Sequence, residues 1–127
     1  MKFICLLHET ARPTAEPPVE LFAAIGAVGA ASTADGSLIE VGGLLPISTG
    51  AVVTLADGAV TTTDGPFVEA RELVGSYAVY DVADAGAAAK KAADFLEAHR
   101  SSWPGWEGWI EVRAVMEAPS GAPGLDA

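Results

Sequence analysis

The sequence predicts a single α+β domain with a β-hairpin inserted near its middle. Segments with strand-like and helix-like hydrophobic patterns follow one another in the order strand, helix, strand, hairpin, strand, helix, strand. An Asp-Gly pair at 57–58 lies between two β-rich segments and marks the hairpin. The chain has 127 residues and is half hydrophobic, which is enough to bury one core but short for two domains.

The first two elements are expected to be a buried strand and a helix. Residues 3–7 are continuously apolar and end at His8, a pattern typical of a strand that is buried on both faces. Residues 17–32 predict a helix that begins at a Pro-Pro pair and ends before the Ala-Asp-Gly sequence at 34–36. Its apolar residues at helical spacing are Leu21, Phe22, Ile25 and Val28.

The middle of the chain predicts a second strand and then the hairpin. The second strand covers residues 38–45, where Gly42 and Gly43 suggest a bulge or the close approach of another group. The hairpin strands cover residues 51–56 and 59–63. The Asp-Gly pair between them suits a type I′ turn, because both residues tolerate positive φ.

The last three elements are expected to complete the main sheet and its second helix. Residues 73–82 predict a strand, and Asp81 or Asp84 can cap the Ala-rich helix that runs to about residue 100. The expected buried stripe of this helix consists of Ala88, Ala92, Phe95, Leu96 and His99. Residues 109–116 alternate between two faces, as in a half-exposed strand. We therefore expect one domain over residues 1–116, followed by a flexible tail at 117–127.

This order of elements is the ferredoxin-like βαββαβ pattern with an inserted hairpin. Its two helices can cover only one face of the sheet. Since the first strand is apolar on both faces, the other face also needs a cover. For so short a chain we expect that cover to be a second copy, and hence a homodimer.

Charge and cysteine content narrow the classes of partner and compartment. Seven Lys and Arg stand against seventeen Asp and Glu, giving a formal charge of −10 that repels nucleic acid and anionic membranes. The single cysteine, Cys5, excludes an intramolecular disulfide and a cysteine zinc cluster, which fits a reducing, cytoplasmic location. The apolar runs are too short for a signal peptide or a membrane span.

The candidate catalytic residues are His8, Asp64, Glu111 and Arg113. His8 can act as a general base or metal ligand near neutral pH, or it can simply end a buried strand. Asp64 begins an Asp-Gly-Pro-Phe turn, which also has a purely structural interpretation. Glu111 and Arg113 share a strand face, where Arg can bind a carboxylate or enolate-like oxygen while Glu handles a proton. The alternative is an ion pair inside the dimer interface.

The tryptophans and the absence of known motifs limit the kinds of site that the sequence predicts. The three tryptophans, Trp103, Trp106 and Trp109, either line an apolar ligand site or fill the core or an interface. The sequence contains no Gly-rich phosphate loop, no Ser-His-Asp spacing and no multi-His motif. We therefore expect no metal and no cofactor. Because the fork of Arg113 can bind a carboxylate through two parallel hydrogen bonds, we expect a small-molecule anion as the ligand.

Several short motifs together resemble a known family. The motifs are Gly-Leu-Leu-Pro at 43–46, Asp-Gly-Pro-Phe at 64–67, then Glu69, Arg71, Glu72, Gly75 and Tyr77, and Ile-Glu-Val-Arg at 110–113. With them the chain is similar, over nearly the whole domain, to the DGPF branch of the YCII-related family. The resemblance implies a dimeric α/β barrel, in which two ferredoxin-like sheets face each other and enclose pockets. In such a pocket we expect Glu72, Tyr77 and Trp109 to bind the ligand.

The resemblance leaves two classes of function open. Family members carry a His and Asp pair suspected of catalysis, but residues 17–32 contain no His here, and Ala114 stands where the family usually has Pro. Asp35 or Asp64 can supply the acid.

The first class of function is a small-molecule enzyme with acid/base chemistry on a carbonyl or carboxylate compound, in a pocket at the dimer sheet interface. The second is a non-catalytic ligand-binding or regulatory interaction module linked to transcriptional stress signalling, because family genes often lie near extracytoplasmic-function sigma factors. A convergent polar cluster beside a cavity favours the enzyme, and scattered, mutually satisfied charges favour the module.

Overall fold

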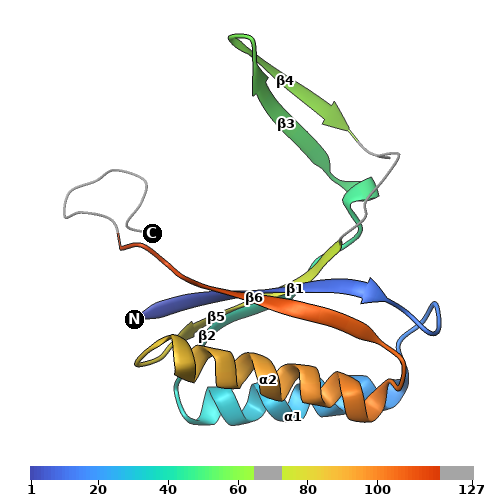
Figure 1. Ribbon diagram of the computed structural model, residues 1–127, viewed down its shortest axis with the longest axis vertical. Helices are drawn as coiled ribbons and strands as arrows, with labels where there is room; N and C mark the ends of the chain where they lie inside the picture. Colours follow the sequence, from blue (N-terminus) through green and yellow to red (C-terminus); the bar gives the residue numbers. More distant parts are fainter. Residues whose placement is uncertain (65–72, 118–127) are drawn as a thin grey trace.

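The computed structural model describes residues 1–64 and 73–117 (Figure 1). The chain forms strands and helices in the order that the hydrophobic pattern predicts. In chain order the elements are β1 (Lys2–Ala11), α1 (Val19–Ala34), β2 (Leu38–Gly43), the 3-10 turn η1 (Ile47–Thr49), β3 (Ala51–Ala56), β4 (Ala59–Asp64), β5 (Leu73–Asp81), α2 (Ala85–Ser102) and β6 (Glu107–Ala114). The expected mixed α+β class is therefore confirmed.

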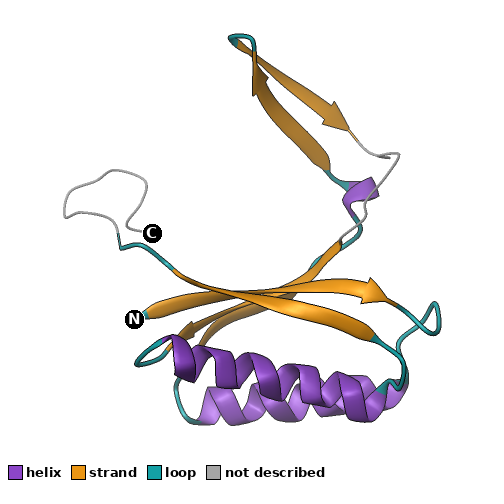
Figure 2. Ribbon diagram, in the orientation of Figure 1, coloured by secondary structure: helices purple, strands orange, loops and turns teal. Residues whose placement is uncertain are grey.

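The main sheet has four strands in the order β2-β5-β1-β6, and each neighbouring pair is antiparallel. Helices α1 and α2 lie side by side on one face of this sheet, and the opposite face carries no helix (Figure 2). β3 and β4 form a separate two-stranded sheet. The described residues of one chain form no closed barrel.

The central strand β1 divides its side chains between the two faces. Phe3 and Cys5 are buried, with Phe3 only 3% exposed, and Cys5 lines a space shared with residues of both helices. The alternate residues Ile4 and Leu6 are half-buried in the single chain. The sequence indicated a strand buried on both faces, but in one chain only the helix side is fully covered, because both helices lie there.

The two helices differ in how well their sequences define a buried face. In α2 the side chain of Asp84 accepts a hydrogen bond from the Ala87 N–H at 2.9 Å, which identifies the N-cap between the two expected candidates. The residues that α2 buries are Ala88, Ala92, Ala98 and His99. In α1 Leu21 is buried, but Phe22 is 62% exposed, contrary to the expected stripe. The only charged residue of α1 is Glu20, so its sequence gives little contrast between faces.

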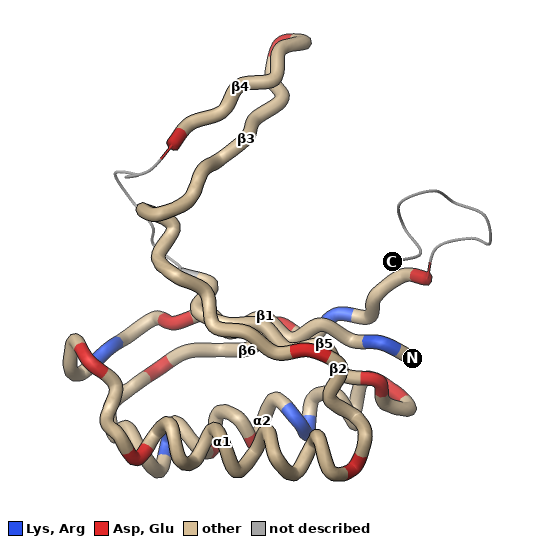
Figure 3. The backbone as a smooth tube through the Cα atoms, turned by 180° about the vertical axis from the view of Figure 1, so that it is seen from behind, with Lys and Arg blue, Asp and Glu red and all other residues tan. Residues whose placement is uncertain are grey.

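The hairpin projects away from the main sheet (Figure 1). Its turn residues Asp57 and Gly58 have φ values of 53° and 75°, which confirms the expected turn with positive φ at both positions. Every residue of β3 and β4 is exposed, including Val53, Leu55 and Val60. The charged residues drawn on the hairpin are all acidic (Figure 3). The hairpin thus presents apolar side chains and negative charge with no core of its own.

Element boundaries shift by a few residues from those expected. β2 ends at Gly43 rather than at residue 45, and Leu44 and Leu45 are exposed before Pro46. α2 continues to Ser102, and β6 starts earlier, at Glu107. Neither described helix combines the length and the apolar character needed to cross a bilayer.

A short polar network joins the end of α1 to α2. The Asp35 carboxylate accepts hydrogen bonds from Lys91 Nζ at 2.6 Å and from the Ser37 hydroxyl and N–H at 2.5 and 2.9 Å. These bonds lower the pKa of Asp35 from 3.8 to about 2, the Lys91 bond being the largest cause. The network therefore favours the charged carboxylate in the folded chain.

We predict that this network stabilises the fold above pH 3.8 and that its contribution disappears as the pH falls to about 2. The sign follows because the folded pKa lies below the unfolded one, so the unfolded chain binds the proton first. Urea unfolding of the native chain and of Asp35→Asn, measured between pH 5 and pH 2, checks this. The two free energies of unfolding should converge at the acid end. A difference that is constant across the range would contradict the prediction.

Candidate functional site

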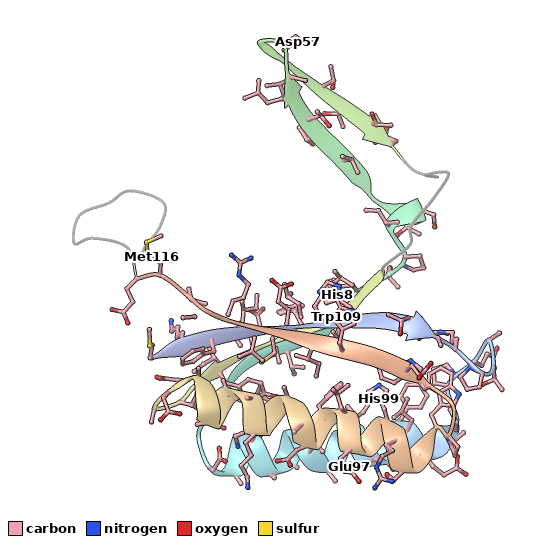
Figure 4. The ribbon with its side chains drawn as sticks, viewed as in Figure 1. His8, Asp57, Glu97, His99, Trp109 and Met116 are labelled. Carbon is pink, nitrogen blue, oxygen red and sulfur yellow. The ribbon has the colours of Figure 1, made fainter. Side chains whose placement is uncertain are left out.

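Three of the expected catalytic residues meet on the sheet face opposite the helices. β1 and β6 are in register with Leu6 opposite Glu111, His8 opposite Trp109 and Ile4 opposite Arg113. Directly opposite residues of neighbouring strands point to the same face. Figure 4 shows His8 and Trp109 together on the side of the sheet away from α2, and His99 on the other side, between the sheet and α2. We call this helix-free side the open face.

The carboxylate of Glu111 lies between His8 and Arg113. His8 Nε2 is 3.3 Å from Glu111 Oε1, and Arg113 Nη1 is 3.5 Å from Glu111 Oε2. The exposed fraction of the side chain increases from His8 to Arg113: it is 11% for His8, 33% for Glu111 and 68% for Arg113. The His8 ring also stacks on Trp109, with centroids 3.9 Å apart and planes 6° from parallel. We call His8, Glu111 and Arg113 the His8 cluster.

This geometry combines a proton-transfer group with an anion-binding group. A carboxylate within hydrogen-bond reach of an imidazole fixes the orientation of the ring. The guanidinium of Arg113 is mostly exposed, so part of its planar fork remains open to an anion. An exposed ion pair such as Glu111–Arg113 adds only about 0.2–1 kcal/mol to stability. The Glu111–Arg113 pair therefore contributes little to the stability of the fold.

Tyr77 lies on the same open face, on the other side of β1. It is opposite Leu6 in the β1–β5 register, and its hydroxyl donates a hydrogen bond to Glu40 Oε1 at 3.1 Å. A Cβ on Gly42 would lie 2.8 Å from Cε1 of the Tyr77 ring. The expected close approach at this glycine pair is confirmed at Gly42, whereas a Cβ on Gly43 would meet no heavy atom within 4 Å.

Glu40 is the residue of this face that sequence reasoning missed. Glu40 accepts a hydrogen bond from Tyr77 and lies two residues before Gly42, which is opposite Tyr77 in the β2–β5 register. Its side chain therefore points to the open face, as that of Tyr77 does. This alternation is visible in the sequence once residues 38–43 are assigned to a strand. The bond to Glu40 raises the pKa of Tyr77, since the carboxylate accepts from the neutral hydroxyl and repels the phenolate.

The remaining expected site residues do not join the His8 cluster in the described structure. Asp64 ends β4 and is exposed on the projecting hairpin (Figure 1). Glu72 lies outside the described residues, as do positions 65–71 of the Asp-Gly-Pro-Phe stretch and its surroundings. His8 lies within β1, which continues to Ala11, rather than at the end of the strand.

The three tryptophans divide between the two sides of the sheet. Trp103 is buried and donates from Nε1 to Thr14 Oγ1 at 3.0 Å, and Trp106 donates from Nε1 to Glu9 Oε1 at 2.8 Å. Both occupy the end of the helix layer, so the core interpretation is confirmed for Trp103. Trp109 is partly exposed on the open face and forms one wall of the His8 cluster.

Potential metal ligands are sparse in the part of the chain that the structure describes. Residues 1–64 and 73–117 contain no group of three or more His, Cys, Asp or Glu side chains placed to hold a metal ion. Burial raises the pKa of Cys5, which favours its neutral thiol over the thiolate that metals and electrophiles need. The absence of metal and cofactor stays a prediction.

Comparison with protein-family models matches residues 1–118 to the YCII-related domain. The match includes β1 and β6, which carry the His8 cluster, and the full four-stranded sheet. A comparison with curated proteins found no match.

We predict that Glu40→Gln lowers the pKa of Tyr77 toward its usual value of 10, because the carboxylate that disfavours the phenolate is removed. Ultraviolet titration of the phenolate measures this. The chain has two tyrosines, so the experiment uses a Tyr80→Phe background. Glu97→Gln, which removes an exposed carboxylate on α2, serves as the control and should leave the Tyr77 titration unchanged. An unchanged titration in Glu40→Gln would contradict the described bond.

Proposed function

The chain belongs to the YCII-related domain family, and from this premise we propose that it is a small-molecule enzyme whose site is the His8 cluster. The proposed reaction is acid/base chemistry on a small carboxylate or carbonyl compound. The observation that carries the proposal is the position of the Glu111 carboxylate between the buried His8 ring and the largely exposed Arg113 guanidinium.

Each residue of the cluster has a role in this proposal. Arg113 binds the substrate carboxylate or the oxygen of an enolate, for which its planar fork is suited. Glu111 or His8 removes and returns a proton on the carbon beside that group, since Glu111 contacts the guanidinium and His8 contacts Glu111. Trp109 supplies an apolar wall, and Tyr77 contributes to the same face across β1.

We further propose that a second copy of the chain covers the open face. The strand order β2-β5-β1-β6 with both helices on one side supports a ferredoxin-like arrangement, and two such sheets facing each other give a dimeric α/β barrel. The half-buried Ile4 and Leu6 and the exposed apolar residues of the hairpin support burial against a partner. Such burial would desolvate Arg113 and strengthen its hold on an anion.

The second candidate is a non-catalytic regulatory or ligand-binding module. The exposed apolar side chains of the hairpin favour it, since a projecting apolar hairpin is suited to binding another protein. In that case Glu111 and Arg113 form an ion pair that fixes the orientation of an interface. Small-anion binding separates a small-molecule site from a protein-interaction module, and turnover of the bound compound separates the enzyme from a ligand-binding module.

We predict that the native chain is a dimer in solution and that Leu6→Gln weakens it about tenfold or more. The change places two copies of an amide in the proposed apolar contact, and each lost Leu contact is worth about 1.5–3 kcal/mol. Sedimentation velocity over a range of concentrations measures the dissociation constant. Val19→Gln is the matched control, because Val19 is an exposed apolar residue on the helix side. A monomeric native chain, or equal effects of both variants, would refute the sheet-face dimer.

We predict that Arg113→Met reduces the affinity for small carboxylates at least tenfold while the dimer persists. Methionine keeps much of the bulk but removes the fork, and a charge-assisted hydrogen bond contributes about 1.5–3 kcal/mol. Calorimetry with a panel of small carboxylates measures this. Arg100→Met is the control, because Arg100 is an exposed Arg paired with Glu97 on α2. If Arg113→Met binds anions like the native chain, or unfolds while Arg100→Met does not, Arg113 is structural and the enzyme proposal fails.

A further inference from the structure

A second site lies on the opposite side of the sheet from the His8 cluster. A cavity of about 230 Å³ separates the helices from the sheet, with walls that are mainly apolar and come from α1, α2, β1, β2, β5 and β6. Apolar cavities of about 150 Å³ are known to bind benzene-sized molecules. This cavity is therefore large enough for a ligand with one aromatic ring.

The cavity continues toward the C-terminal end of α2. A neighbouring cavity of about 340 Å³ has several of the same wall residues, among them Leu7, Ile25 and Phe95, so the two spaces adjoin. His99 and Trp106 form part of the wall of the second space. Phe22 and Val41 also line it and are exposed, which places its opening between α1 and β2.

His99 is a buried polar group in this wall. The residue is 4% exposed, and Figure 4 shows its side chain between α2 and the sheet. Its Nδ1 lies 3.0 Å from the Phe95 carbonyl oxygen, one turn back on the same helix. A carbonyl oxygen can only accept, so Nδ1 carries the hydrogen, and in the neutral ring Nε2 is an acceptor. Nδ1 points back to α2, so Nε2 points away from that helix and toward the cavity.

Within the described chain, His99 Nε2 has no hydrogen-bond partner. The bond to Phe95 is the hydrogen bond that the ring makes, and its other neighbours are the rings of Phe95 and Trp106 at 5.0 and 4.3 Å. Nε2 is not among the inaccessible polar atoms of the described residues that lack a partner, so it borders open space in the wall of the second cavity. A ligand in that space could donate a hydrogen bond to Nε2.

The other polar side chains of the wall near His99 are paired with one another. Glu9 Oε1 accepts hydrogen bonds from Arg12 Nε at 2.7 Å and from Trp106 Nε1 at 2.8 Å. The cation of Arg12 is thus already neutralised by Glu9. The negative charge of Glu9 would repel a ligand carboxylate, whereas it would not repel a neutral molecule.

We propose that the two adjoining cavities together bind a small neutral molecule, mainly aromatic or aliphatic, whose hydrocarbon part occupies the first cavity and whose one hydroxyl group donates a hydrogen bond to His99 Nε2 in the wall of the second. The apolar walls bind the hydrocarbon part, and His99 selects the hydroxyl. The site does not depend on the His8 cluster, because it lies on the helix side of the sheet and uses none of the cluster's residues, although Tyr77 also lines the first cavity.

The test compares p-cresol with p-xylene, which have similar shapes but differ by a hydroxyl in place of a methyl group. Calorimetry and the thermal shift of the native chain are measured with each probe. We expect p-cresol to bind about five- to tenfold more tightly, as for one hydrogen bond to a buried acceptor. Equal affinities, tighter binding of p-xylene, or no binding of either probe would overturn the proposal.

Three variants locate the binding. His99→Phe keeps a ring against Phe95 and Trp106 but removes the acceptor, so the preference for p-cresol should disappear while p-xylene binding remains. Gly29→Leu should fill the cavity and abolish binding of both probes, since a Cβ there meets no heavy atom within 4 Å and Gly29 lines the wall. Arg113→Met should bind both probes like the native chain.

The outcomes remain decisive if one variant fails to fold. Should His99→Phe not fold, the comparison of the two probes on the native chain and the loss of binding in Gly29→Leu decide the proposal. A folded His99→Phe that retains the p-cresol preference, or a folded Gly29→Leu that binds both probes normally, would refute it. Loss of p-cresol binding in Arg113→Met would place the probe on the open face instead, which also refutes it.

Discussion

The central position of β1 is the constraint on which the rest of the structure depends. It pairs with β5 on one side and with β6 on the other, so both edges of its backbone are hydrogen-bonded within the sheet. Its alternation sends Phe3 and Cys5 toward the helices and His8 toward the open face. A slip of one residue would exchange these environments, placing an imidazole in the apolar core and a thiol beside Glu111. The pairing of one strand thus fixes the position of both candidate sites.

The sequence was sufficient to predict the kinds and order of the elements because each is encoded locally. The Asp-Gly turn, the Asp84 cap and the alternation of β6 all depend on neighbouring residues. The orientation of α1 was not predictable in this way. Its residues are small or apolar around most of the helix, and Gly26 and Gly29 add no side chain to mark a face. Which residues it buries is decided by packing against β2 and α2, and Phe22 is exposed as a result.

The candidate site was partly predictable for a related reason. Glu111 and Arg113 are two residues apart on one strand, so their common face follows from the period of a strand. Their proximity to His8 depends on the register between strands about 100 residues apart, and the bond between Tyr77 and Glu40 depends on another such register. Register is set by the pairing of the whole sheet, which includes an irregularity between Leu7 and His8 in the β1–β5 pairing and another between Glu9 and Ala11 in the β1–β6 pairing. No short stretch of sequence contains that information.

The hairpin gives the molecule two parts of very different intrinsic stability. A two-stranded hairpin is at best marginally stable in water, and β3 and β4 bury none of their residues in a single chain. The helix and sheet layers, by contrast, hold their own core. In the proposed dimer the partner would supply the missing burial, and the order of β3 and β4 would then depend on protein concentration as well as on sequence. Amide hydrogen exchange would accordingly proceed by two separate processes, with opening of the hairpin well below the energy of global unfolding.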